Sequence, residues 1–243
     1  MIPYKFGRIS EIDPSNAKSW ADRYFITFDV DWACDAVIAD TVKLVESSDI
    51  AATWFITHDS PWVERLRQNP RFELGIHPNF NFLLQGNPCN GASSKDVVER
   101  LLRIVPEARA VRSHSMTQSS RLLDLFKEAG LSHDCNHFIP YHVDLELKPW
   151  LHWNGIIKVP YFWEDDVDCL ESGNRRFNEI LKCKGLCVFD FHPIHVFLNT
   201  ESMKRYEKTS SIREKPSELI LRRHTGYGTR NQLIDLLSLA NKQ

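Results

Sequence analysis

Two aspartates, Asp29 and Asp31, directly follow an apolar, β-branched run at residues 24–28. If the strand continues through them, both side chains point to one face, because strand side chains repeat every two residues. Two carboxylates on one face repel each other unless a cation or a proton lies between them. The pair therefore indicates a metal site in which one aspartate binds the ion and the other stays free as a base. The alternative is that the strand has ended and both are solvated loop residues.

His77 follows a second apolar run, at residues 72–76, and is a candidate metal ligand. A neutral imidazole at the end of a strand is well suited to zinc. Asn81 lies four residues further on, and a helical turn would place both side chains on one face. Its amide oxygen is a weaker zinc ligand than imidazole. The alternative for His77 is an ordinary structural histidine.

Arg112, His192 and His195 complete the set of candidates. Arg112 ends a short apolar segment and can hold a carboxylate in its two-pronged fork, unless it makes only a surface salt bridge. The two histidines follow an apolar strand and are candidates for a general acid; the alternative is one histidine that caps the strand. In barrel-like α/β folds, sites form at the carboxyl ends of strands. The conjunction of these residues therefore predicts one catalytic rim.

The elements that must position these residues alternate between hydrophobic runs and helical patterns. This alternation is typical of βα units around a mainly parallel sheet. A polar, charged stretch at residues 199–229 is either a mobile lid or a solvated insertion without a functional part. We predict strands at residues 24–28, 50–57, 72–76, 110–112 and 186–191, extended segments at 138–147 and 156–161, and helices at 35–48, 61–68, 93–105, 122–129, 175–181 and 230–240.

Composition narrows the class of protein. The chain has 243 residues, which fits one α/β domain over residues 1–243, with a core at about 22–198 and a polar excursion plus a C-terminal helix at 199–243. The net charge of −2 gives no reason to expect a nucleic-acid partner. No apolar stretch approaches the roughly 18 residues of a membrane span, so we expect a cytoplasmic protein. The six scattered cysteines predict free thiols.

The order of these motifs resembles the polysaccharide deacetylases (carbohydrate esterase family 4, with the NodB-homology fold). Members open with T-F-D-D-G, and residues 27–32 are similar to branches with D-x-D. Their H-x-x-x-H motif corresponds to His77 and Asn81, where the second histidine is replaced. Their arginine motif corresponds to Arg112, and their late histidine to His192. The pattern is most similar to WbmS-like proteins of O-antigen or other surface-polysaccharide clusters.

The resemblance implies a distorted (β/α)7 barrel and a role for each matching residue. Asp29 is then the general base, Arg112 orients it, and His192 is the general acid. Asp31, His77 and, as a third member, Asn81 are implied ligands of a divalent metal, zinc by preference. The implied reaction is N-deacetylation of an acetylated amino sugar on a nucleotide- or lipid-linked saccharide.

Two departures from the family pattern leave alternatives open. Residues 113–115 read Ser-His-Ser where the family has Pro-Tyr, so His114 is a candidate substitute for Asn81. With the altered ligand motif, the chain could instead hydrolyse another small amide, or be a metal-poor, non-catalytic carbohydrate-binding relative. Further candidate site residues are His195, the aromatic residues Trp32 and Trp163 as sugar platforms, and Asp165 as a carboxylate that orients a catalytic partner.

Overall fold

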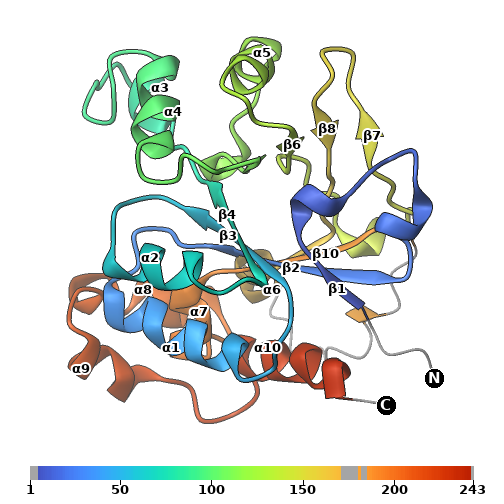
Figure 1. Cartoon of the computed structure of the whole chain (residues 1–243). Helices are drawn as coiled ribbons and strands as arrows, with labels where there is room; N and C mark the ends of the chain where they lie inside the picture. Colours follow the sequence, from blue (N-terminus) through green and yellow to red (C-terminus); the bar gives the residue numbers. More distant parts are fainter. Residues whose placement is uncertain (1–4, 171–179, 182–184, 242–243) are drawn as a thin grey trace.

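One curled, mainly parallel sheet organises the molecule (Figure 1). The computed structural model describes residues 5–170, 180–181 and 185–241. Within these residues the strands run in the order β7-β8-β6-β5-β4-β3-β2-β10-β9, with β1 paired to β2. The strands are β1 (Lys5–Gly7), β2 (Arg23–Asp29), β3 (Ala52–Ile56), β4 (Phe72–Ile76), β5 (Ala110–Val111), β6 (His133–Asp134), β7 (Trp150–Leu151), β8 (Ile157–Lys158), β9 (Trp163–Glu164) and β10 (Cys187–Phe191).

The two ends of this sheet are joined by a single run of chain, residues 157–164. Its first part, β8, pairs in parallel with β6, and its last part, β9, pairs in parallel with β10. Pro160 lies between them and has no backbone N–H to donate, which explains why this segment forms two short strands instead of one continuous strand. A bridge between Phe138 and Tyr161 continues the pairing across the gap. The sheet is therefore curled into a distorted barrel, in agreement with the expected fold.

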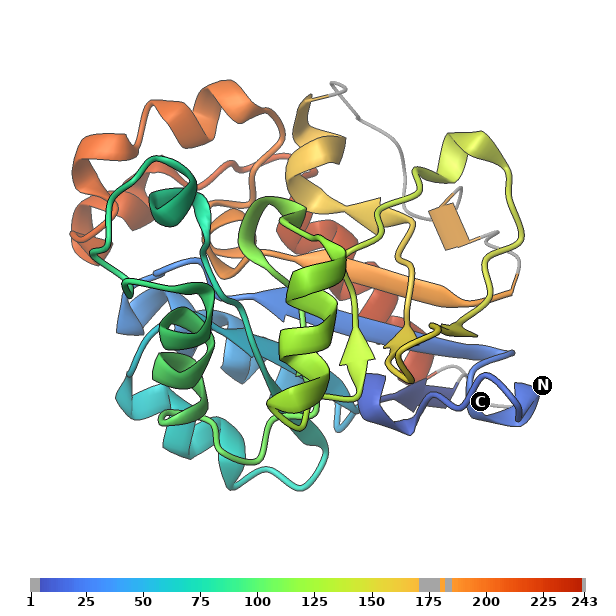
Figure 2. The ribbon, with the colours of Figure 1, turned by 90° about the horizontal axis from the view of Figure 1, so that it is seen from above.

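Helices cover the outside of the sheet. Figures 1 and 2 show α4 and α5 over one side of the strands, and α1, α7 and α10 over the other. The α-helices are α1 (Asp35–Glu46), α2 (Pro61–Arg67), α3 (Asn81–Leu84), α4 (Ser94–Leu102), α5 (Ser120–Glu128), α6 (Asp165–Leu170), α7 (Pro193–Leu198), α8 (Met203–Glu207), α9 (Pro216–Leu219) and α10 (Thr229–Leu237).

Local sequence explains where these helices begin and which face they bury. Ser93 caps α4 by accepting from the Asp96 N–H, and the Asp96 carboxylate accepts from the Ser93 N–H, so two backbone N–H groups are satisfied. Ser119 caps α5 in the same way through its hydroxyl. Apolar residues of these helices are buried at helical spacing, among them Val97 and Leu101 in α4 and Leu122 and Phe126 in α5.

The structure contains elements that we did not predict, among them β1, β6, β7 and α7, and it differs from the predicted elements elsewhere. Within residues 138–147, where we predicted extended chain, Tyr141–Val143 form a short 3-10 helix between Pro140 and Asp144, which adopts a left-handed conformation with φ 53°. The polar stretch 199–229 folds into short helices with a buried Leu219. Most of the predicted helix at 175–181 lies outside the described residues.

The structure also bears on the expectations about cysteines and membrane spans. Cys34, Cys89, Cys135 and Cys169 are free, but Cys187 is disulfide-bonded, so the prediction of free thiols is wrong for that residue. No helix among the described residues is long and apolar enough to cross a membrane.

Candidate active site

The turn after β2 carries both aspartates of the opening motif. Asp29 is the last residue of β2 and is only 4 % exposed. Asp31 and Trp32 adopt left-handed backbone conformations, with φ 45° and 54°. Such conformations are costly for residues other than glycine and cluster at functional sites. Asp31 thus lies beyond the strand, and the strained turn, rather than strand alternation, brings it to the same site as Asp29.

Asp31 faces two histidines across a triangle of potential metal ligands. Its Oδ1 lies 3.1 Å from His77 Nε2 and 3.1 Å from His114 Nδ1, and these two nitrogens are 3.3 Å apart. Ligands about 2.1 Å from a tetrahedral zinc ion lie about 3.4 Å from one another. Two imidazoles and one carboxylate are also a donor set that catalytic zinc sites use. These three side chains, which we call the ligand triangle, therefore fit one divalent ion.

The other ring nitrogen of His77 faces Asp29. Its Nδ1 lies 3.5 Å from Asp29 Oδ2 without a hydrogen bond, and the ring is only 2 % exposed. A carboxylate on this side is the partner that usually orients a ligating imidazole. Burial raises the pKa of Asp31, but hydrogen bonds from His114 and His77 outweigh it and hold that pKa well below its usual value. Asp31 is therefore an anion in this site.

Asn81, the expected third ligand, makes different contacts. It begins α3, and its side-chain amide donates a hydrogen bond to Ser115 Oγ at 3.1 Å. His114, on the 3-10 helix His114–Met116, occupies the third corner of the triangle instead. Ser115 has a left-handed φ of 56°, so a second strained turn positions this histidine.

Arg112 lies buried at the centre of the barrel, 1 % exposed. Its Nη1 donates to Asp29 Oδ1 at 3.0 Å, to Thr27 Oγ1 at 2.9 Å and to Asp190 Oδ1. Its guanidinium carbon also lies 4.4–4.7 Å from the ring centres of two aromatic residues, Phe55 and Tyr161.

These neighbours decide the protonation states around Arg112. Burial lowers the pKa of Arg112, but the carboxylates of Asp190 and Asp29 raise it well above its usual value. Burial raises the pKa of Asp190, Arg112 opposes this, and the outcome lies well above the usual range of a carboxyl group. Arg112 is therefore held as a cation by the carboxyl groups of Asp190 and Asp29.

His192 follows β10 and is paired with Asp165, the first residue of α6. Its Nδ1 lies 2.7 Å from Asp165 Oδ1, and its backbone N–H donates to Asp165 Oδ2 at 2.8 Å. Its Nε2 points back toward the ligand triangle, 3.6 Å from Asp31 Oδ2. Burial lowers the pKa of His192, but the charge and hydrogen bond of Asp165 raise it well above its usual value. Asp165 therefore favours the protonated form of this ring.

Three of the further candidates lie in different surroundings. The Trp32 ring is 37 % exposed and meets the His114 ring edge-on at 5.0 Å, so it borders the ligand triangle. Trp163 is only 1 % exposed and packs against Phe191, so its ring is part of the core. His195 is also buried, and its Nδ1 pairs with Thr200 Oγ1 at 3.1 Å.

The sequence reasoning missed several residues that the fold brings to this rim. Asp190 lies two residues before His192 on β10, so strand alternation placed both on one face and could have found it. Glu164 and Asp166 each have a carboxylate oxygen close to a ring nitrogen of His192. Burial, and then the charge of Asp166, raise the pKa of Glu164 well above its usual value. Nothing in their spacing distinguished these two acids from a solvated helix start.

Comparison with known proteins identifies the class. The model of the WbmS-like polysaccharide deacetylase family matches residues 26–210, which is well over half of the chain. The chain therefore belongs to the WbmS-like polysaccharide deacetylases, hydrolases that act on amide bonds. No curated protein matches the sequence.

One solved structure is similar over nearly the whole chain. It is a Bordetella bronchiseptica protein described as a polysaccharide deacetylase involved in O-antigen biosynthesis, with 45 % identity and a TM-score of 0.92. The match covers 96 % of this chain and 97 % of that one. A Mycobacterium smegmatis protein described as a polysaccharide deacetylase has 13 % identity and a TM-score of 0.48, over 90 % and 91 % of the two chains. It is too distant to bear on the site.

Proposed function

We propose that this protein is a metal-dependent N-deacetylase that hydrolyses the acetamide of an acetylated amino sugar, in the biosynthesis of O-antigen or a related surface polysaccharide. The observation that carries the proposal is the ligand triangle of Asp31, His77 and His114, with Asp29 and His192 beside it. Family membership and the 45 % identical Bordetella relative support the substrate class.

The donor set supports a zinc ion held by Asp31, His77 and His114, with His114 in the place that the family pattern assigns to Asn81. A divalent cation bound there supplies a water of lowered pKa and polarises the acetamide carbonyl. The buried second nitrogen of His77 beside Asp29 supports the same assignment.

Each remaining residue has a step in the proposed reaction. Asp29, oriented by Arg112, accepts the proton of the water that adds to the carbonyl carbon. The bond between carbon and nitrogen then breaks, and His192 donates a proton to the leaving nitrogen, giving acetate and a free amine. Asp165 positions His192 and stabilises its protonated form.

The test combines elemental analysis of the purified protein with acetate release from a panel of N-acetylated sugars and sugar nucleotides. We expect one equivalent of a divalent metal and acetate release that Asp29→Asn removes. Activity confined to non-sugar amides would assign a different amide substrate. A protein that binds saccharides but neither binds metal nor releases acetate would be a non-catalytic relative, and the proposal would be wrong.

A further inference from the structure

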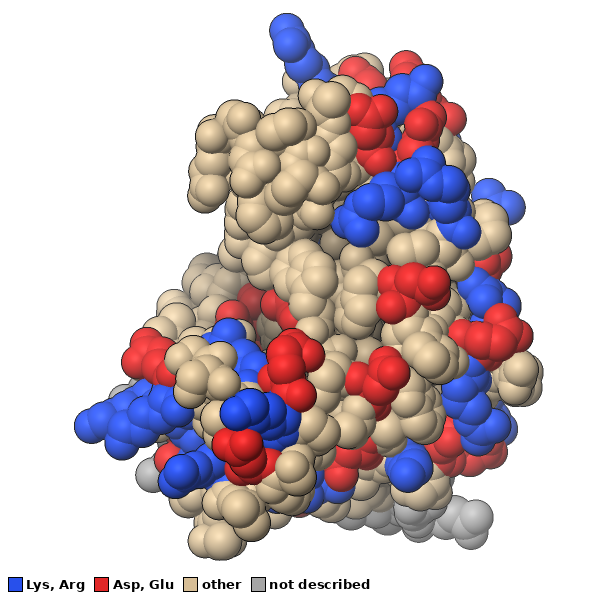
Figure 3. All heavy atoms as spheres, turned by 90° about the vertical axis from the view of Figure 1, so that its left-hand side faces the viewer, with Lys and Arg blue, Asp and Glu red and all other residues tan. Residues whose placement is uncertain are grey.

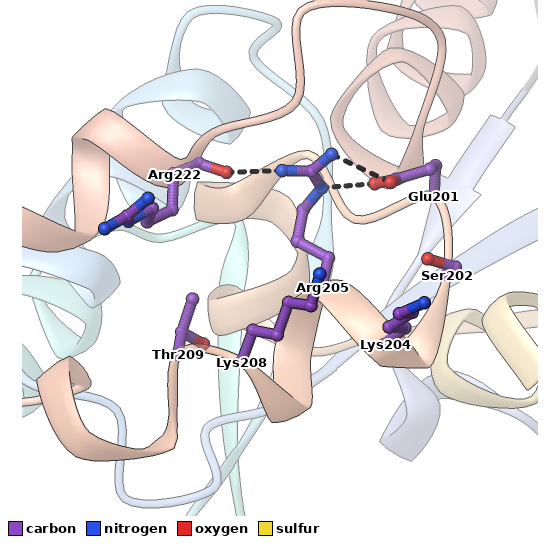
Figure 4. Close-up of a pocket in the computed structure, with 7 residues that line it drawn as sticks. All are labelled: Glu201, Ser202, Lys204, Arg205, Lys208, Thr209 and Arg222. Carbon is purple, nitrogen blue, oxygen red and sulfur yellow. Dashed lines mark hydrogen bonds and ion pairs between the residues drawn. The ribbon is translucent and has the colours of Figure 1, made fainter.

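A pocket of about 490 Å³ lies on the segment that follows α7. We call it the basic pocket. Figure 4 shows its side chains, with Lys204 on α8, Lys208 directly after that helix, and Arg205 held between Glu201 and the backbone carbonyl of Arg222. The residues that line it are Glu201, Ser202, Lys204, Arg205, Lys208, Thr209 and Arg222.

The basic pocket has an excess of positive charge. Its one acid, Glu201, is neutralised by Arg205, whose Nε and Nη2 both donate to the carboxylate. Lys204, Lys208 and Arg222 are exposed, and none of them has an ion pair within the described residues. Three uncompensated cations thus surround one pocket in a chain whose net charge is −2. Figure 3 shows the face on which α8 and α9 lie, with a group of basic side chains in its lower part.

Helix α8, which carries part of the basic pocket, is connected to the proposed catalytic rim through packed side chains. Helix α8 packs against α6, whose first residue, Asp165, holds His192. On the same helix the Tyr206 ring contacts His195 at 4.7 Å between ring centres, and His195 contacts His192 at 5.7 Å. Two ring contacts therefore connect the helix of the basic pocket to the proposed acid.

We propose that the basic pocket binds the diphosphate group of a saccharide diphosphate and so presents the attached acetylated sugar to the catalytic rim. Two adjacent phosphates carry the density of negative charge that Lys204, Lys208 and Arg222 match, and lysine and arginine are the side chains that bind phosphate best. Ser202, whose hydroxyl is a further hydrogen-bonding group, lines the same pocket. An uncharged sugar chain has no anionic group that could pair with these three cations. The role in presenting the sugar rests on the proposed deacetylase function; the binding of diphosphate does not.

The first experiment measures binding of inorganic diphosphate by calorimetry at fixed ionic strength, since these contacts are screened by salt. Removal of two charge-assisted contacts in Lys204→Gln/Lys208→Gln predicts binding weaker by about tenfold or more. Lys18→Gln/Lys43→Gln is the matched control, because both lysines are exposed and lie outside the basic pocket. His77→Ala should bind diphosphate as the wild type does, which excludes chelation at the ligand triangle.

The second experiment identifies the source of the diphosphate. A nucleoside diphosphate and a soluble isoprenoid diphosphate compete with inorganic diphosphate, and the stronger competitor shows which carrier the substrate has. With a linked substrate, the double variant should raise KM and leave kcat unchanged. Equal diphosphate binding in the pocket variant and the wild type, or no binding by the wild type, overturns the proposal. Diphosphate binding without acetate release would overturn the deacetylase function and leave the basic pocket in place.

Discussion

Asp29 tests the proposed chemistry at the scale of one residue. Its carboxylate accepts a hydrogen bond from Arg112 but is not one of the three side chains of the ligand triangle. Asp29→Asn keeps the shape and removes the base, so we expect acetate release to fall by about 10²–10⁴-fold, the usual contribution of a general base. Metal content, measured by elemental analysis, should stay at the wild-type level. Loss of metal from Asp29→Asn would make Asp29 a ligand and contradict the assigned role.

His114 and Asn81 make opposite predictions for metal binding. His114 Nδ1 lies 3.1 Å from Asp31 Oδ1, whereas the Asn81 amide is engaged with Ser115. We therefore expect His114→Ala to weaken zinc binding strongly and Asn81→Ala to change it little, in titrations with a competing chelator. Removal of one of three protein ligands should cost more than the 10–100-fold that a surrounding hydrogen-bond partner contributes. The reverse order of the two variants would restore Asn81 as the ligand.

The sequence predicted which candidate residues lie near one another better than it predicted their geometry. Asp29, Arg112 and His192 were predictable because each ends an apolar strand, and strand ends share one rim. Asp31 was expected beside Asp29 because of strand alternation, but the strand ends at Asp29, and a left-handed turn places Asp31 there instead. His114 could only be weighed as a substitute, because the distance across the rim depends on a strained turn that no pattern specifies.

At the scale of elements, Arg112 joins three strands through one side chain. It directly follows β5 and donates hydrogen bonds to Asp29 on β2 and to Asp190 on β10. Arg112→Gln removes the cation and leaves buried carboxyl groups behind, so we expect the free energy of unfolding to fall by about 3–5 kcal/mol. Urea denaturation measures the loss. Addition of Asp190→Asn should restore part of it, and no restoration would mean that the two residues are not coupled.

His133 on β6 makes the stability of the barrel dependent on pH. Its Nε2 bonds to the Ile12 carbonyl, and burial lowers its pKa while that bond raises it less. The unfolded chain therefore binds more protons below about pH 6.5, and stability should fall as the pH falls through that value. His133→Gln should flatten this fall in urea melts between pH 7 and pH 5. His142→Gln, at an exposed histidine, is the control and should melt as the wild type does at each pH.

The long elements were predictable from sequence, and the closure of the barrel was not. The strand at residues 72–76 and the helix that begins at Asp35 follow directly from apolar periodicity. Closure depends on residues 157–164, where pairing passes from β6 to β10 on either side of Pro160. Strands of two residues are too short for a period to show, and their partners are set by tertiary packing.

At the scale of the whole molecule, the segment after α7 connects the barrel to the basic pocket. The sequence left it open as a lid or a solvated insertion, since its residues are polar and charged. Its fold depends on contacts with distant parts of the chain: Asp40 on α1 accepts from Arg223 at 3.2 Å and also from Arg230. Because such partners lie about 180–190 residues apart, local patterns could not predict them.

The pairing of Asp40 leads to a prediction for the whole molecule. Its side chain and those of Arg223 and Arg230 are about one-quarter exposed, so Asp40→Asn should cost at most about 1 kcal/mol of global stability. The effect should instead be local: hydrogen exchange should speed up at residues 220–230 and stay unchanged in the barrel strands. Asp49→Asn, which removes a more exposed pair with Arg71, is the control and should leave residues 220–230 unaffected. If Asp40→Asn also leaves them unchanged, the segment is held by its apolar contacts, such as Leu219, rather than by charge.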